Sequence, residues 1–137
     1  MNNHAKPTAE LTKNQSLVMT TLTQSESALS AYAILDQLRD SGFRAPLQVY
    51  RALEKLVEFS MVHRLESINA FIACSHPACD GHKALAFMIC DECGRVDEIT
   101  DHSLANRLKH LADKSSFTLN KATIELHGIC QSCQSFQ

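Results

Sequence analysis

Apolar residues recur at helical spacing through the first part of the chain and predict helices there. The face expected to be buried in the first helix contains Leu11, Val18, Met19 and Leu22. The segment 30–43, SAYAILDQLRDSGF, predicts a second helix with Ser30 as its N-cap and Gly42 as its C-cap. Its expected buried side chains are Ala33, Ile34, Leu38 and Phe43.

The segment 46–59 predicts the clearest helix, because Pro46 suits a first helical turn and one apolar stripe follows it. That stripe consists of Val49, Leu53, Leu56 and Val57. Next, MVHRLES and NAFIAC flank a polar break at Ile68-Asn69 and predict a β-hairpin. Helices followed by a two-stranded ribbon indicate a winged helix-turn-helix, whose third helix would enter the major groove of DNA.

The pattern changes at 74–83, CSHPACDGHK, which holds few residues that could pack in a core. Beyond it, 84–90 and 94–100 predict two strands, and 117–130 ends in a third. Between them, 101–115 predicts an amphipathic helix with Asp101 as N-cap and Leu104, Leu108 and Leu111 buried. We therefore expect an α+β fold with a winged-helix domain at 1–75, a hinge at 76–83 and an α/β domain at 84–137.

Composition bears on the compartment and on the cysteines. The 137 residues begin without an apolar signal segment and hold no run long enough to span a membrane, so we expect a cytoplasmic protein. Thiols stay reduced there, which favours metal ligands over disulfides. The net charge of −2 does not by itself favour nucleic acid, so DNA binding would need a local patch.

Four of the six cysteines form two Cys-x-x-Cys pairs, Cys90 with Cys93 and Cys130 with Cys133. Structural zinc sites are closed tetrahedra of such ligands, and the helix and strand between the pairs could bring them together. The pairs therefore predict a structural zinc site. The alternative is redox dithiols or disulfides, but neither pair opens a helix that would stabilise a thiolate.

Further residues of metal-ligating type remain around the hairpin and the hinge. They are His63, Cys74, His76, Cys79, His82 and Glu98. A cysteine, two histidines and a carboxylate would suit zinc. Each residue also has an ordinary interpretation: a surface histidine, a small buried thiol or a solvated carboxylate. Spacing alone leaves the choice open, and His76 and Cys79 could compete for the same metal.

The segments VYRALEKL at 49–56 and VHRLES at 62–67, together with the paired cysteines, resemble the ferric uptake regulator family over almost the whole chain. Within that family the sequence is most similar to the zinc-responsive branch. The resemblance implies a homodimeric, metal-dependent transcriptional repressor that binds double-stranded DNA operators. For the zinc-responsive branch, it implies repression of zinc-uptake genes when zinc is bound, with two zinc ions per chain.

The resemblance also assigns residues. It implies that Tyr50 and Arg51 contact DNA, and arginine is well suited to guanine. It implies that the paired cysteines hold structural zinc and that a regulatory zinc is bound by His63, Cys74, His82 and Glu98. The segment 84–87, ALAF, lacks the histidine-rich motif of iron-sensing members. This departure disfavours iron sensing.

Three other functions compete with this interpretation. A family member could sense another metal, although a thiolate at Cys74 favours zinc. A zinc-stabilised protein-interaction module would not bind DNA. An enzyme is disfavoured because no open metal-site motif such as His-Glu-x-x-His and no Ser/His/Asp grouping stands out.

Overall fold

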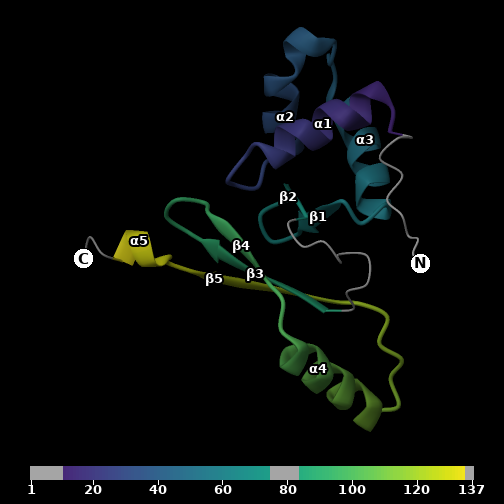
Figure 1. Cartoon of the computed structure of the whole chain (residues 1–137), viewed down its shortest axis with the longest axis vertical. Helices are drawn as coiled ribbons and strands as arrows, with labels where there is room; N and C mark the ends of the chain where they lie inside the picture. The colour runs from purple at the N-terminus through teal and green to yellow at the C-terminus, as the bar shows by residue number, and fades with distance from the viewer. Residues whose placement is uncertain (1–10, 75–83, 135–137) are drawn as a thin grey trace. The chain divides into compact units, whose positions relative to one another are not determined.

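The protein divides into two compact units, residues 1–80 and 81–137 (Figure 1). The structure, a computed structural model, describes residues 11–74 and 84–134. The predicted hinge at 76–83 lies outside the described residues, so the proposed domain limits stay a prediction. Among the described residues, no helix is both long and apolar enough to cross a membrane.

The first unit begins with helices whose ends are fixed by side chains. They are α1 (Lys13–Thr23), α2 (Ala31–Gln37), the 3₁₀ turn η2 (Arg39–Ser41) and α3 (Pro46–Glu58). Thr12 and Gln15 cap α1 reciprocally, each side chain accepting from the other's backbone N–H at 3.1 Å. Ser30 caps α2 as predicted, and Gly42 ends η2 with a φ of 100°, where a side chain would be strained.

The three helices enclose one apolar core, in which Val18, Ile34, Phe43, Val49, Leu53 and Leu56 are almost fully buried. Four side chains expected in this core, Leu11, Met19, Ala33 and Val57, are only half-buried. Ala31, Leu35 and Ala52 are buried instead. In α2 these buried positions lie two residues to either side of Ala33, so the sequence pattern identified the buried stripe of these helices only approximately.

The predicted hairpin consists of β1 (Val62–Leu65) and β2 (Ala70–Ala73), paired antiparallel. Asn69, with a φ of 48°, lies in its turn, and asparagine tolerates this left-handed conformation. Leu29 fastens the hairpin to the helices, since its N–H and C=O both bond to Phe71. Helices and ribbon together form the winged helix-turn-helix that the sequence predicts.

The second unit contains a three-stranded sheet with strand order β4-β3-β5. Its elements are β3 (Ala84–Cys90), β4 (Val96–Ile99), α4 (His102–Lys114), β5 (Ala122–Gly128) and α5 (Gln131–Gln134). β3 runs antiparallel to β4 and parallel to β5. The order ββαβ was predicted, and with the first unit it confirms the α+β class; the short α5 was not predicted.

Helix α4 departs from expectation. Asp101 caps it as predicted, accepting from the N–H groups of Ser103 and Leu104. None of its residues is buried, however: Leu104 and Leu108 are half-buried and Leu111 is 47% exposed. Figure 1 shows α4 beyond the end of the sheet, and not packed on its face. The apolar stripe of this helix is therefore left largely uncovered by its own unit.

Candidate metal centres and nucleic-acid interface

The sheet of the second unit brings the two Cys-x-x-Cys pairs to one edge. Cys90 is the last residue of β3, and it lies opposite Gly128, the last residue of β5. The Asp91 N–H continues this pairing by donating to the Gly128 carbonyl at 2.7 Å. Because the strands are parallel and in register, the turns that follow them leave the sheet side by side.

The first turn, residues 90–95 and here called the first knuckle, closes on itself. The Cys90 N–H donates to the Arg95 carbonyl at 2.9 Å, and the Gly94 N–H donates to the Cys90 carbonyl at 3.0 Å. Gly94 has a φ of 78°, a conformation that glycine adopts without strain. This closure directs the sulfurs of Cys90 and Cys93 to the same side of the turn.

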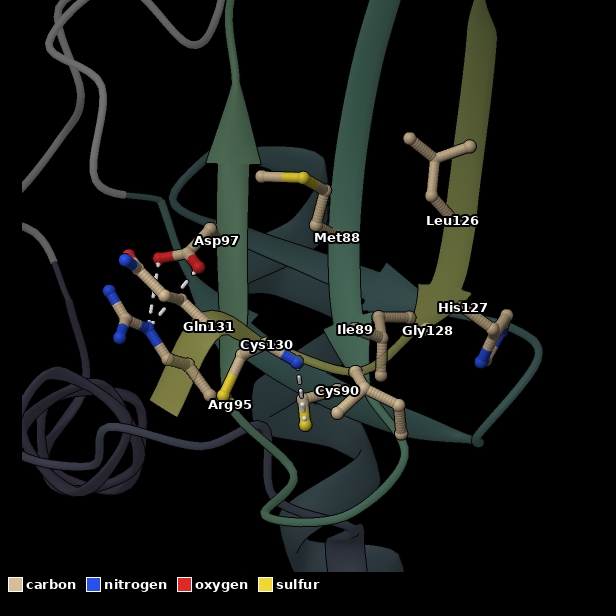
Figure 2. Close-up of a pocket in the computed structure, with 11 residues that line it drawn as sticks. Met88, Ile89, Cys90, Arg95, Asp97, Leu126, His127, Gly128, Cys130 and Gln131 are labelled. Carbon is tan, nitrogen blue, oxygen red and sulfur yellow. Dashed lines mark hydrogen bonds and ion pairs between the residues drawn. The ribbon is translucent and has the colours of Figure 1, made fainter. Parts of the chain in front are cut away.

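The second knuckle, residues 128–134, begins as a turn and continues as α5. The Cys130 N–H donates to the Cys90 sulfur at 3.3 Å, which joins the two knuckles directly (Figure 2). The Gln134 N–H donates to the Cys130 carbonyl at 3.0 Å. Cys133 thus lies about one helical turn after Cys130, with both sulfurs near the first knuckle.

The four sulfurs have the spacing of a zinc tetrahedron. All lie within 4.8 Å of one another, with Cys90 and Cys133 sulfurs 3.8 Å apart and Cys93 and Cys130 sulfurs 3.7 Å apart. Zinc–sulfur bonds of about 2.3 Å in a tetrahedron place sulfurs about 3.8 Å apart. A disulfide would need about 2.05 Å, and all four cysteines are free. The geometry therefore fits the predicted zinc ligands and not the disulfide alternative.

The surroundings also shift the pKa values of two of these thiols in opposite directions. The Cys130 N–H, followed by the Cys93 N–H, stabilises the Cys90 thiolate and lowers the pKa of Cys90 to about 6. At Cys133, the neighbouring Cys130 side chain and then desolvation raise the pKa to about 12. Sulfurs this close cannot all ionise by themselves. A bound divalent cation is the group that would let them do so.

Two further features of this edge were not predicted. The His127 ring nitrogen Nδ1 lies 3.3 Å from an Asp91 carboxylate oxygen and links β5 to the first knuckle. Beside it is a cleft of about 480 Å³, into which Met88 and Leu126 project from adjacent strands (Figure 2). Asp91 directly follows the predicted ligand Cys90, and His127 lies shortly before Cys130. This closeness in sequence to predicted ligands was the signal that could have pointed to them.

In the first unit, the hairpin brings together two of the four predicted regulatory ligands. The Cys74 N–H donates to the Met61 carbonyl at 2.9 Å, which continues the β1–β2 pairing by one residue. His63 is two residues from Met61 and lies on the same face, and its ring nitrogen is within 4.8 Å of the Cys74 sulfur. His63 is only 9% exposed. Cys74 is disulfide-bonded in the structure, so zinc ligation would require its reduction.

The other two predicted regulatory ligands belong to the second half of the sequence. Glu98 lies on β4 opposite Phe87 and is half-buried. His82 lies outside the described residues, as do His76 and Cys79.

The predicted DNA-contacting residues lie on α3, although in different environments. Arg51 is exposed, whereas Tyr50 is half-buried and packs partly against the core. The first turn of α3 is held by Gln48, whose side-chain oxygen accepts from the N–H groups of Arg44 and Ala45 at 2.7 and 3.1 Å. One side of this helix is therefore exposed to solvent, while its opposite side packs in the core and its first turn is held by Gln48.

A winged helix-turn-helix joined to a small sheet with four clustered cysteines matches one family closely. The model of the Ferric uptake regulator family matches residues 7–133. The chain belongs to this family. The zinc uptake regulation protein of Escherichia coli (strain K12) is 36% identical over 130 residues, which cover 94% of this chain and 75% of that protein. The ferric uptake regulation protein of Legionella pneumophila is 30% identical over 109 residues, 77% of this chain and 76% of that protein.

Solved structures agree with this membership. A zinc uptake regulator complexed with zinc and DNA superposes with a TM-score of 0.85 at 34% identity, covering 96% of this chain and 88% of that one. The holo form of XcZur superposes with a TM-score of 0.81 at 35% identity, covering 91% and 86%. The family assignment made from the sequence is confirmed, including its similarity to zinc uptake regulators.

Proposed function

We propose that this protein is a zinc-responsive, DNA-binding transcriptional repressor that represses zinc-uptake genes when zinc is bound. The observation that carries the proposal is the pairing of a winged helix-turn-helix with a four-cysteine cluster of zinc dimensions, in a chain 34% identical to a zinc uptake regulator complexed with zinc and DNA. Such a protein acts on DNA in the cytoplasm, and its family consists of regulators rather than enzymes.

The first zinc has a structural role in this proposal. Cys90, Cys93, Cys130 and Cys133 bind it, and it fastens the ends of β3 and β5. The sulfur spacing of 3.7 and 3.8 Å across the cluster supports this assignment. Since all four ligands belong to the second unit, this zinc stabilises that unit by itself.

The second zinc has a regulatory role, which makes two zinc ions per chain. His63 and Cys74 from the winged-helix unit bind it together with His82 and Glu98 from the second half of the sequence. The approach of the His63 ring to the Cys74 sulfur supports the first half of this ligand set. Zinc thereby fixes the orientation of the two units, and it shifts their equilibrium only by its preference for that orientation.

DNA is bound through α3, with Arg51 reading a base in the major groove and Tyr50 contacting a base or phosphate. Reading double-stranded operators requires two such helices about 34–36 Å apart, and a homodimer supplies them. The exposed apolar side chains of the second unit support dimerisation there, namely Met88, Leu111, Phe117 and Leu126. Side chains of this size are otherwise expected to be covered.

The deciding experiment measures DNA affinity as a function of free zinc. A duplex selected from a random library by the reduced, zinc-loaded protein is titrated in zinc buffers, with fluorescence anisotropy as readout. We expect zinc to tighten binding at least tenfold, and His63→Ala and Glu98→Gln to remove this response while retaining one tightly bound zinc by native mass spectrometry. His110→Ala and Asp113→Asn, on the exposed face of α4, are matched controls that keep the response.

Equal DNA affinity with the regulatory ligands intact and removed would refute zinc sensing at this site. Equal affinity with and without zinc, at constant folding, would refute the repressor mechanism as a whole. A response to another divalent metal at lower free concentration than zinc would assign the protein to the sensing of that metal.

A further inference from the structure

The solvent-facing side of α3 changes character along its length. Its exposed residues form one stripe at helical spacing, from Leu47 and Arg51 to Glu54, Lys55 and Glu58. The second half of the stripe is unsuited to the DNA backbone, because two carboxylates would face phosphates and Lys55 is paired with Glu58 at 3.4 Å. We therefore expect the first two turns of this helix to make its contacts with DNA bases.

Within the first turn, Leu47 is the side chain presented outward. It is 56% exposed, although the unit buries most of its other leucines. Its two neighbours in the chain have fewer polar groups available to contact a base. Pro46 has no N–H group, and the Gln48 side-chain oxygen already accepts from the N–H groups of Arg44 and Ala45. More than half of the surface of this side chain is therefore not covered by packing within the unit.

We propose that Leu47 is a specificity-determining residue that contacts the C5-methyl group of a thymine in the operator. This inference rests on the proposed entry of α3 into the major groove. The methyl group of thymine is the apolar feature that base edges present there, and it is the natural partner for a leucine. Leu47 and Arg51 are four residues apart, about 6 Å along the helix, so the thymine lies within about two base pairs of the base read by Arg51.

Single-atom changes in DNA test this contact. In the selected duplex, each thymine is replaced in turn by uracil, which lacks only the C5-methyl group, and binding of the zinc-loaded full-length protein is measured. We expect one replacement per half-site to weaken binding about three- to tenfold, near the base whose identity Arg51 reads. Leu47→Ala weakens binding to the thymine duplex similarly, and uracil at that position causes no additional loss.

Ile68→Ala is the matched control, since Ile68 is an exposed aliphatic residue of the same unit at 40% exposure. It should retain the full uracil sensitivity. Leu47→Ala that remains as sensitive to uracil as the unaltered protein at every position overturns the inference, as does a duplex in which no uracil has an effect.

Arg51→Ala separates this inference from the function on which it rests. If Arg51→Ala loses binding but Leu47→Ala leaves the uracil profile unchanged, only the thymine contact is refuted. If Arg51→Ala binds as well as the unaltered protein, α3 does not read the DNA and the proposed interface itself fails.

Discussion

Removing one ligand of the four-cysteine cluster tests how the second unit is held together. Cys93→Ser is the most informative change, because Cys93 is exposed and its loss removes a zinc ligand without opening a cavity. Serine is nearly isosteric, but its hydroxyl is not a thiolate. Any large effect of this variant on folding therefore reports the metal site and not the packing of the side chain.

The structure sets the expected magnitude. In residues 86–134, the large buried apolar side chains are Phe87, Ile89 and Val96. Full burial of such side chains contributes roughly 1.5–3 kcal/mol each, about 5–9 kcal/mol together. Structural zinc in zinc-finger peptides contributes roughly 10–16 kcal/mol of apparent binding free energy. Zinc is thus the larger contribution, and we expect the sheet to lose its stable structure without it.

Hydrogen exchange measured by mass spectrometry on the full chain is the suitable assay, because it separates the two units. In Cys93→Ser, peptides over β3, β4 and β5 should exchange fast, while those over α1, α2 and α3 keep their protection. Glu92→Ala, an exposed change between the same two cysteines, should exchange like the unaltered protein. Full protection of the sheet in Cys93→Ser, with zinc absent by native mass spectrometry, would refute the structural role of the metal.

Two further predictions concern the core and pH. Phe43→Ala, at a side chain only 1% exposed, should destabilise the first unit by about 3–5 kcal/mol in urea unfolding, whereas Tyr32→Ala, at 61% exposure, should cost little. The thiols of the cluster must lose their protons to bind zinc, so acid weakens zinc binding. The unfolding temperature of the zinc-loaded protein should therefore fall between pH 8 and pH 6, and a constant value would contradict this linkage.

Local patterns predicted the elements better than the contacts between them. The stripe of α3 and the caps Ser30 and Asp101 depend on residues within a few positions of one another, so the sequence specifies them. The burial of Leu104 and Leu108 on α4 was predicted wrongly for the opposite reason. An amphipathic pattern indicates that a helix has an apolar face, but it does not say whether the same chain or a partner covers that face.

The same distinction applies to the candidate sites. The paired cysteines could be predicted to form a cluster, because each Cys-x-x-Cys spacing fixes two ligands locally and the parallel register of β3 and β5 does the rest. The Asp91–His127 contact joins residues 36 positions apart, of types that are common on any surface. Leu47 likewise has no special pattern in the sequence. Its significance depends on being exposed on the same stripe as Arg51.

The distribution of ligands between the two units decides which of the two proposed zinc ions can regulate DNA binding. The four cysteines belong to one unit, so zinc bound there has the same affinity for every orientation of the winged helix and cannot shift that equilibrium. A set drawn from His63, Cys74, His82 and Glu98 would bind well in one orientation alone. Moving a two-state equilibrium from 1:99 to 99:1 needs about 5.5 kcal/mol of differential affinity. This is well below the roughly 10–16 kcal/mol that zinc supplies in four-ligand protein sites, so the second site could be weak enough to release zinc and still control DNA binding.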